Sequence, residues 1–287
     1  MDKRESWKNS WNIAFQGIRK NFTSIRFYTV LVAVIIFSWT QVSGVRDYAQ
    51  SQGLGVSFWY YPFLFSTFIC TLFLYFGIVL LFCNAPFIDG QQMFVILRSG
   101  KKTWFRGQIL FIILSSAGYF TYIWLLSVVL FLPILGFNGD WGTVFWDMAR
   151  YHQEVVVSGG FLLDERTLSM FSPVEGCCFV WLINVLTGSF LGFLIFYVNL
   201  YKSRTYGSVA ALMVVLVSNI IRFIGDYANR IVYISPVSWS DLSVYARVQN
   251  PLSPVYTISV LVAGNVILAV LIMRRSKKYS IEAMEDL

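Results

Sequence analysis

The residues best suited to chemistry are few, and their spacing completes neither a catalytic nor a metal-binding motif. Gly100-Lys101-Lys102-Thr103 comes closest to a phosphate-binding loop. Val95 stands where that loop requires its first glycine, and Lys102 stands where it requires a serine or threonine for Mg²⁺. His152, the single histidine, lacks a nearby set of carboxylates or cysteines that would complete a metal site. We therefore predict that the chain is not an enzyme and binds no cofactor itself.

The four cysteines follow no disulfide or zinc spacing. Cys70 and Cys83 fall in one apolar run, and Cys177 and Cys178 are adjacent. We predict that all four are small apolar packing residues.

The composition argues against an ordinary water-soluble domain. The 287 residues are 57% hydrophobic and 18% aromatic, and only 13% are charged, about half the charged share of a typical soluble domain. A soluble fold of this size needs a charged shell that this sequence cannot supply. We predict an all-α integral membrane protein, because helices satisfy their own backbone hydrogen bonds in lipid.

The chain contains several long apolar stretches. A helix needs about 20 apolar residues to cross a bilayer, and these stretches are long enough. Six such stretches are predicted, at residues 27–45, 60–83, 109–133, 177–200, 207–225 and 254–273. Together they define a transmembrane domain over 27–273. A segment at 1–26 precedes this domain, and a tail at 274–287 follows it.

The distribution of Lys and Arg predicts the orientation. Most of the 22 basic residues flank one side of the predicted spans if the N-terminus is cytoplasmic. Six spans then return the C-terminus to the cytoplasm, and the long loop 134–176 lies outside. The net charge of +7 is therefore a topology signal, and we expect no nucleic-acid partner.

The segment 1–26 has a helical apolar face with an aromatic character. Its members are Trp7, Trp11, Ala14, Phe15, Ile18 and Phe22. This pattern predicts an amphipathic helix at the membrane interface, with its basic residues toward anionic lipid. A helix packed against the rest of the protein is the alternative.

The predicted cytoplasmic loop 84–108 combines a short amphipathic helix with a basic flank. The residues that could contact a partner are Gln91, Met93, Phe94, Leu97, Arg98, Lys101, Trp104 and Arg106. Such a helix suits docking into a groove on another protein. The alternative is a helix resting on lipid headgroups with its cations extended toward water.

Polar residues within the spans are rare, and such residues usually face a bundle interior or water. The candidates for a substrate path or gate are Asn184, Asn219, Arg222, Asp226 and Asn265. For the asparagines, hydrogen bonding between helices is the alternative. For Arg222 and Asp226 it is an ion-pair ladder at the helix end.

The layout and several local patterns resemble the permease subunits of type-2 ATP-binding-cassette exporters. The matching parts are the helix around Trp7–Lys20, the loop 91–108 with Arg98-Ser99-Gly100-Lys101, and the outer segment Ile234–Trp239. Trp141–Val144 is similar to a recurrent piece of related bacterial permeases. The long loop 134–176 departs from the smaller members.

The resemblance implies a function for the whole chain. It implies a bacterial plasma-membrane protein with a coupling helix between spans two and three and a partly re-entrant segment between spans five and six. A separate ATPase subunit would bind ATP and Mg²⁺ and contact the loop 84–108. Because one such unit forms half a pathway, a homodimer or a second related permease is also implied. The competing hypothesis is a non-transporting scaffold or sensor that binds a ligand through loop 134–176.

Overall fold

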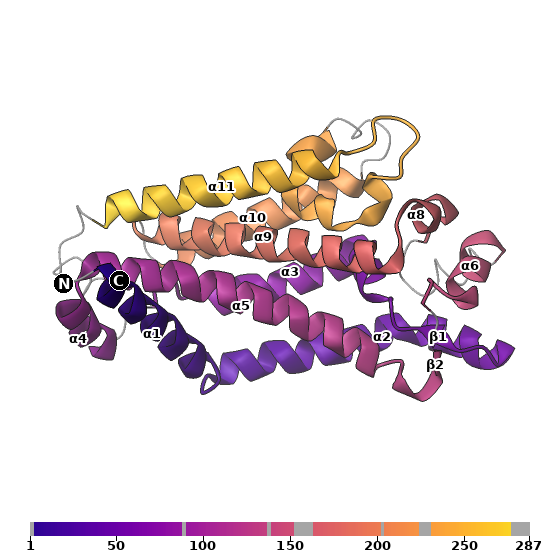
Figure 1. The fold of residues 1–287 in the computed structure, drawn as a ribbon, viewed down its shortest axis with the longest axis horizontal. Coiled ribbons are helices and arrows are strands. Elements are labelled where there is room, and N and C mark those ends of the chain that lie inside the picture. The colour runs from indigo at the N-terminus through magenta and orange to yellow at the C-terminus, as the bar shows by residue number, and fades with distance from the viewer. Residues whose placement is uncertain are drawn as a thin grey trace.

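The computed structural model describes residues 3–87, 90–136, 139–151, 163–201, 204–223 and 231–276. These residues form an elongated helical bundle (Figure 1). Its helices are α1 (Lys3–Asn21), α2 (Ile25–Gln52), α3 (Phe68–Phe82), α4 (Gly90–Ser99), α5 (Lys101–Val129), α6 (Thr143–Arg150), α8 (Glu165–Met170), α9 (Pro173–Asn199), α10 (Arg204–Phe223) and α11 (Pro254–Arg275). Two short strands, β1 (Val56–Ser57) and β2 (Leu135–Gly136), pair in parallel.

Four helices are long and apolar enough to cross a membrane, namely α2, α5, α9 and α11. The chain is therefore a multi-pass membrane protein by the length and composition of its helices. At the two other expected spans, 60–83 and 207–225, the apolar helices are shorter. Helix α3 has 15 residues, a length of about 22 Å, and the apolar part of α10 covers Thr205–Ile220. Six full-length spans are thus not established.

The second expected span is broken by its own sequence. Pro62 favours the 3₁₀ helix Tyr61–Phe65, because proline fixes φ near the value that a helix start needs. Thr67 then adopts an extended conformation with φ −108° and ψ 154°. Helix α3 therefore begins only at Phe68.

Helix α9 forms the centre of the bundle and contacts α3, α5, α10 and α11. Its start is fixed by a capping box in which Ser172 and Glu175 each bond the other's backbone. Gly192 allows neighbouring helices to approach, since a Cβ there would lie 2.5 Å from Ile112 Cγ2. This close packing through small residues is typical of membrane helices.

Helix α1 packs along the first third of α5 through its small residues. The Ser10 hydroxyl donates to the Thr103 carbonyl at 3.0 Å, and Ile13 lies against Gly107. On this face, α1 is packed against the rest of the protein, which is the alternative given for the segment 1–26. The other face exposes Trp7, Trp11, Phe15 and Phe22 by about half, whereas Ala14, expected beside them, is buried against the core.

The two ends of the bundle differ in chemistry. Helix α4, the start of α5 and the end of α11 lie together at one end, and α6 and α8 lie at the other (Figure 1). At the α4 end, the Arg275 guanidinium sits 4.3 Å over the Tyr201 ring, and Lys101, Lys102 and Ser276 line one cavity. The structure thus gathers several of the basic residues at a single end.

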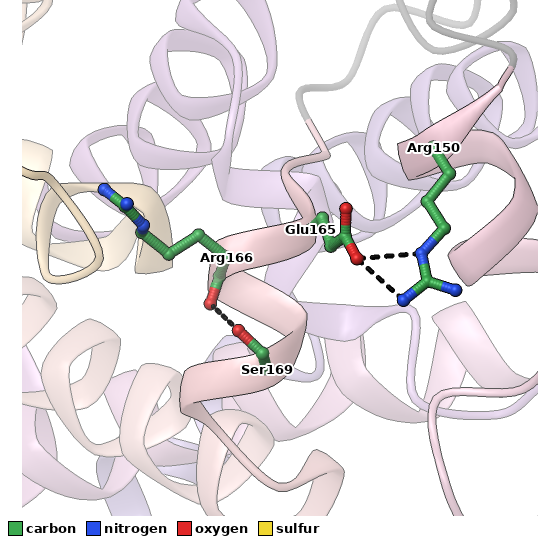
Figure 2. Close-up of polar contacts among 4 residues, drawn as sticks. All are labelled: Arg150, Glu165, Arg166 and Ser169. Carbon is green, nitrogen blue, oxygen red and sulfur yellow. Dashed lines mark hydrogen bonds and ion pairs between the residues drawn. The ribbon is translucent and has the colours of Figure 1, made fainter.

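At the opposite end, the described parts of loop 134–176 are folded onto the bundle. Buried Trp141 donates its Nε1–H to the carbonyls of Leu168 and Phe171 at 3.1 and 2.9 Å. The Arg150 guanidinium donates from Nε and Nη2 to Glu165 Oε1 at 2.8 and 2.7 Å and so joins α6 to α8 (Figure 2). His152 lies outside the described residues.

Candidate functional site

The candidate docking element is α4, which a break separates from α5. Gly100 stands between the two helices with φ 82°, a left-handed value that glycine adopts without steric cost. The chain therefore ends α4 at Ser99 and starts α5 in a new direction at Lys101. This geometry makes α4 a separate short helix, as the sequence predicts for the loop 84–108.

The two faces of α4 have different surroundings. Ile96 is 2% exposed and belongs to the core, and Met93 is half-buried against it. On the opposite face, Phe94 is 75% and Leu97 is 64% exposed, and Arg98 is also exposed. Spacings of three and four residues bring these three side chains onto one helix face. The side chain of Gln91 lies outside the described residues.

Two residues of the predicted docking set have internal roles instead. Trp104 is fully buried and donates its Nε1–H to Gln92 Oε1 at 2.9 Å. It therefore offers no contact surface, and it fastens α4 to α5 from inside. The Arg106 guanidinium lies 5.6 Å over the Trp7 ring, which ties it to α1 by a cation–π contact. Lys101 is partly exposed and lines the cavity near Ser276. Among the described side chains of the predicted set, the exposed ones are Phe94, Leu97 and Arg98.

Among the predicted path residues, Asn184 is fully enclosed in the protein. Its Oδ1 accepts from the Tyr75 hydroxyl at 2.6 Å, and its Nδ2 donates to the Tyr61 hydroxyl at 3.0 Å. The three side chains are buried and connect α9 with α3 and the 3₁₀ helix before it. This arrangement favours a role in holding helices together.

Asn265 and Asn219 bond to helix backbones. Asn265 Nδ2 donates to the carbonyls of Leu186 on α9 and Leu261 on α11, at 3.0 and 2.8 Å. Asn219 Nδ2 donates to the Val215 carbonyl at 2.9 Å, and its buried Oδ1 has no hydrogen-bond partner. The described contacts thus connect these residues to neighbouring backbones and do not gather them with Asn184 in one polar channel.

The remaining predicted path residues cannot be placed in this network. The side chain of Arg222 and all of Asp226 lie outside the described residues.

Asn199 is a polar residue of the fourth expected span that is not among the predicted path residues. It donates from Nδ2 to the Ala85 carbonyl at 2.7 Å, and its Oδ1 accepts from the Gly207 backbone N–H at 2.8 Å. One buried amide thereby joins the end of α9, the segment after α3 and the start of α10. Its partners are 114 and 8 residues away, so sequence spacing gave no direct signal for the longer contact.

Most of residues 235–246, in the segment before α11, are buried, although the sequence places them in an outer loop. The 3₁₀ helices Ile231–Ile234, Pro236–Ser240 and Leu242–Val244 follow one another there. Pro236–Ser240 contacts α9, α10 and α11, and the Ser238 hydroxyl donates to the Ser218 carbonyl at 3.0 Å. Trp239 is buried and donates its Nε1–H to the Val232 carbonyl at 2.7 Å. This segment therefore folds back between helices.

No family model matches the chain, and neither do curated proteins or solved structures. Among the described residues, no group of three or more His, Cys, Asp or Glu side chains could hold a metal ion.

Proposed function

We propose that this chain is the membrane-spanning permease subunit of an ATP-driven exporter of the ATP-binding-cassette class. In this proposal a separate subunit binds and hydrolyses ATP with Mg²⁺, and α4 docks onto that subunit. A second copy of the chain, or a related permease, completes the substrate pathway. The α4 end faces the cytoplasm of a cell whose plasma membrane holds the protein.

The observation that carries the proposal is the free face of α4. Phe94 and Leu97 are 75% and 64% exposed beside Arg98, at the end of the bundle where basic residues gather. Large apolar side chains on an exposed helix face, flanked by a cation, suit insertion into a groove on a partner protein.

The connection from α4 to the bundle supports a coupling role. The Trp104–Gln92 hydrogen bond fixes α4 on α5, and α5 packs along the central helix α9. A displacement of α4 by a partner would therefore pass to α5 and α9 as rigid elements. The buried segment Pro236–Ser240 also favours the proposal, because the resemblance implies a re-entrant segment before the last span.

Co-purification of the tagged chain with an ATP-binding-cassette ATPase subunit tests the proposal. We expect the tagged chain to retain the ATPase in mild detergent and Arg98→Glu to weaken that retention. Arg166→Glu is the matched control, because it makes the same charge change at an exposed residue of α8, at the other end. Recovery of no ATPase, or equal retention by both variants, would contradict the proposal.

A further inference from the structure

A mainly apolar cavity of about 240 Å³ lies between four helices. Its lining comes from the end of α1, the start of α2, the end of α3 and the middle of α5. The aliphatic and phenylalanine side chains that line it are Ile18, Phe22, Phe27, Leu31, Leu81 and Leu114. Among the described lining residues there is no charged side chain, and the polar ones besides two tyrosines are Asn21 and Ser115. The cavity therefore favours an uncharged, apolar occupant.

The two tyrosines that line the cavity also present apolar surface to it. The Tyr119 hydroxyl donates to the Leu74 carbonyl at 2.8 Å, and the Tyr122 hydroxyl donates to the Leu31 carbonyl at 3.0 Å. A phenol has one proton to donate, and in both residues a helix backbone already accepts it. An occupant of the cavity therefore meets mainly the rings.

The cavity reaches the surface of the bundle. Gly118 on its α5 wall is exposed, and Phe22 at its α1 edge is 53% exposed. A Cβ at Gly118 would meet nothing within 4 Å, so the missing side chain leaves a gap in this wall. An occupant can therefore enter from outside the bundle.

The surface around this opening belongs to α2 and α5, two of the helices that are long and apolar enough to cross a membrane. No charged residue occurs between Arg26 and Arg46 on α2, or between Arg106 and the end of α5. Leu31 on the cavity wall is five residues beyond Arg26, about 8 Å along α2. The opening thus lies where the apolar surface begins, in the half of the bundle nearer α4 (Figure 1). Lipid chains are the medium that reaches it there.

The size and shape of the cavity suit part of a lipid chain. A cavity of about 150 Å³ with a comparable apolar lining binds benzene, and this cavity is larger. Its α5 wall runs from Leu114 to Tyr122, about 12 Å along the helix axis. Side chains that line an unfilled space lose van der Waals contacts, and methylene groups would restore them. An elongated apolar space beside hydrocarbon fits a methylene chain better than a compact ring.

We propose that this cavity is a binding site for one hydrocarbon chain of a bilayer lipid. The chain enters between Phe22 and Gly118 and lies along α5, and the headgroup stays outside the cavity. The contacts are made by the chain, so binding does not depend on the charge of the headgroup. The site is independent of the proposed transport function, because it needs only a multi-pass membrane protein.

Photocrosslinking of the full-length chain in phosphatidylcholine vesicles tests the site. The probe is a phosphatidylcholine with a diazirine on one acyl chain, and peptide mass spectrometry locates the adducts. We expect more adducts on the α5 wall, Leu114–Tyr122, than on the exposed apolar face of α11, which reports ordinary lipid contact. A phosphatidylglycerol probe with the same chain should give the same pattern.

Three results of this experiment would overturn the proposal. Equal adduct yields on α5 and α11 would mean that the lipid makes only ordinary contacts. The absence of adducts on the α5 wall would mean that another occupant, such as a second copy of the chain, fills the cavity. Adducts with only one of the two probes would mean that the headgroup, and not the chain, is recognised.

Substitution of Gly118 tests the cavity itself. Because a Cβ there has open space, Gly118→Leu should fold and fill part of the cavity. We expect this variant to lose the α5 adducts and Gly118→Ala, a smaller addition, to retain most of them. The control is Ala263→Leu, which enlarges an exposed side chain of α11 outside the cavity and should keep the wild-type pattern. Equal α5 adducts in wild type and a folded Gly118→Leu variant would also overturn the proposal.

Discussion

Replacement of Gly107 by leucine tests how α1 is held on α5. A Cβ at this position would lie 2.6 Å from Ile13 Cγ2 and 3.0 Å from the Ser10 carbonyl oxygen. Because the second atom belongs to the backbone of α1, the clash is relieved only if the helix moves away. Overpacking of this kind costs about 1–3 kcal/mol. Loss of the Ser10–Thr103 hydrogen bond adds about 0.5–1.5 kcal/mol.

The matched control for this prediction is Gly118→Leu on the same helix. Both substitutions raise helix propensity equally, by somewhat under 1 kcal/mol, but Gly118 has open space beyond its Cα. The difference between the two variants therefore isolates the clash. We expect Gly107→Leu to be less stable by about 1.5–4.5 kcal/mol, the sum of the overpacking and hydrogen-bond costs.

Disulfide trapping measures the position of α1 directly. The hydroxyls of Ser6 and Thr103 lie 3.2 Å apart, so Ser6→Cys with Thr103→Cys should cross-link rapidly on mild oxidation. We expect Gly107→Leu to slow this cross-linking strongly and Gly118→Leu to leave it unchanged. Equal cross-linking rates and equal melting temperatures in the two variants would refute the packing argument.

Three further predictions concern single contacts. Asn184→Ala should destabilise the folded protein in detergent by about 1–3 kcal/mol, because the buried Tyr75 hydroxyl loses its acceptor. Thermal denaturation measures this loss, and an unchanged melting temperature would argue against the buried network. Arg150→Gln should change the unfolding free energy by less than about 1 kcal/mol, since both side chains of its ion pair with Glu165 are about half exposed. A larger loss of unfolding free energy would show that this pair organises the loop 134–176. Trp104→Phe should speed tryptic cleavage at Arg98, because α4 loses its hydrogen bond to α5; an unaltered cleavage rate would mean that other contacts hold α4.

The sequence predicted the apolar helices well where their ends carry local signals. The last span, expected at 254–273, corresponds to α11 at Pro254–Arg275, because a proline at the start and arginines at the end mark its limits. The first span, expected at 27–45, continues as α2 to Gln52. Its final part is polar, so hydropathy gives no signal there, and Gly53 with φ 65° ends the helix.

The candidate site was predicted only in part, because burial depends on packing between distant segments. The periodicity of Phe94 and Leu97 correctly indicated an apolar face on a short helix, and both are exposed. The same reasoning placed Trp104 on the docking surface, although the side chain is buried. Sequence alone cannot tell whether an amphipathic tryptophan points outward or inward. Likewise Asn184 finds its partners Tyr75 and Tyr61 more than 100 residues away.

Thiol labelling from one side of the membrane tests the arrangement on which the account rests. In a background without the four native cysteines, Phe94→Cys on α4 and Tyr151→Cys after α6 report opposite ends, and the native side chains are 75% and 73% exposed. A membrane-impermeant reagent applied to intact cells should label only Tyr151→Cys, and Phe94→Cys should react after permeabilisation. Labelling of Phe94→Cys in intact cells would contradict a cytoplasmic docking helix.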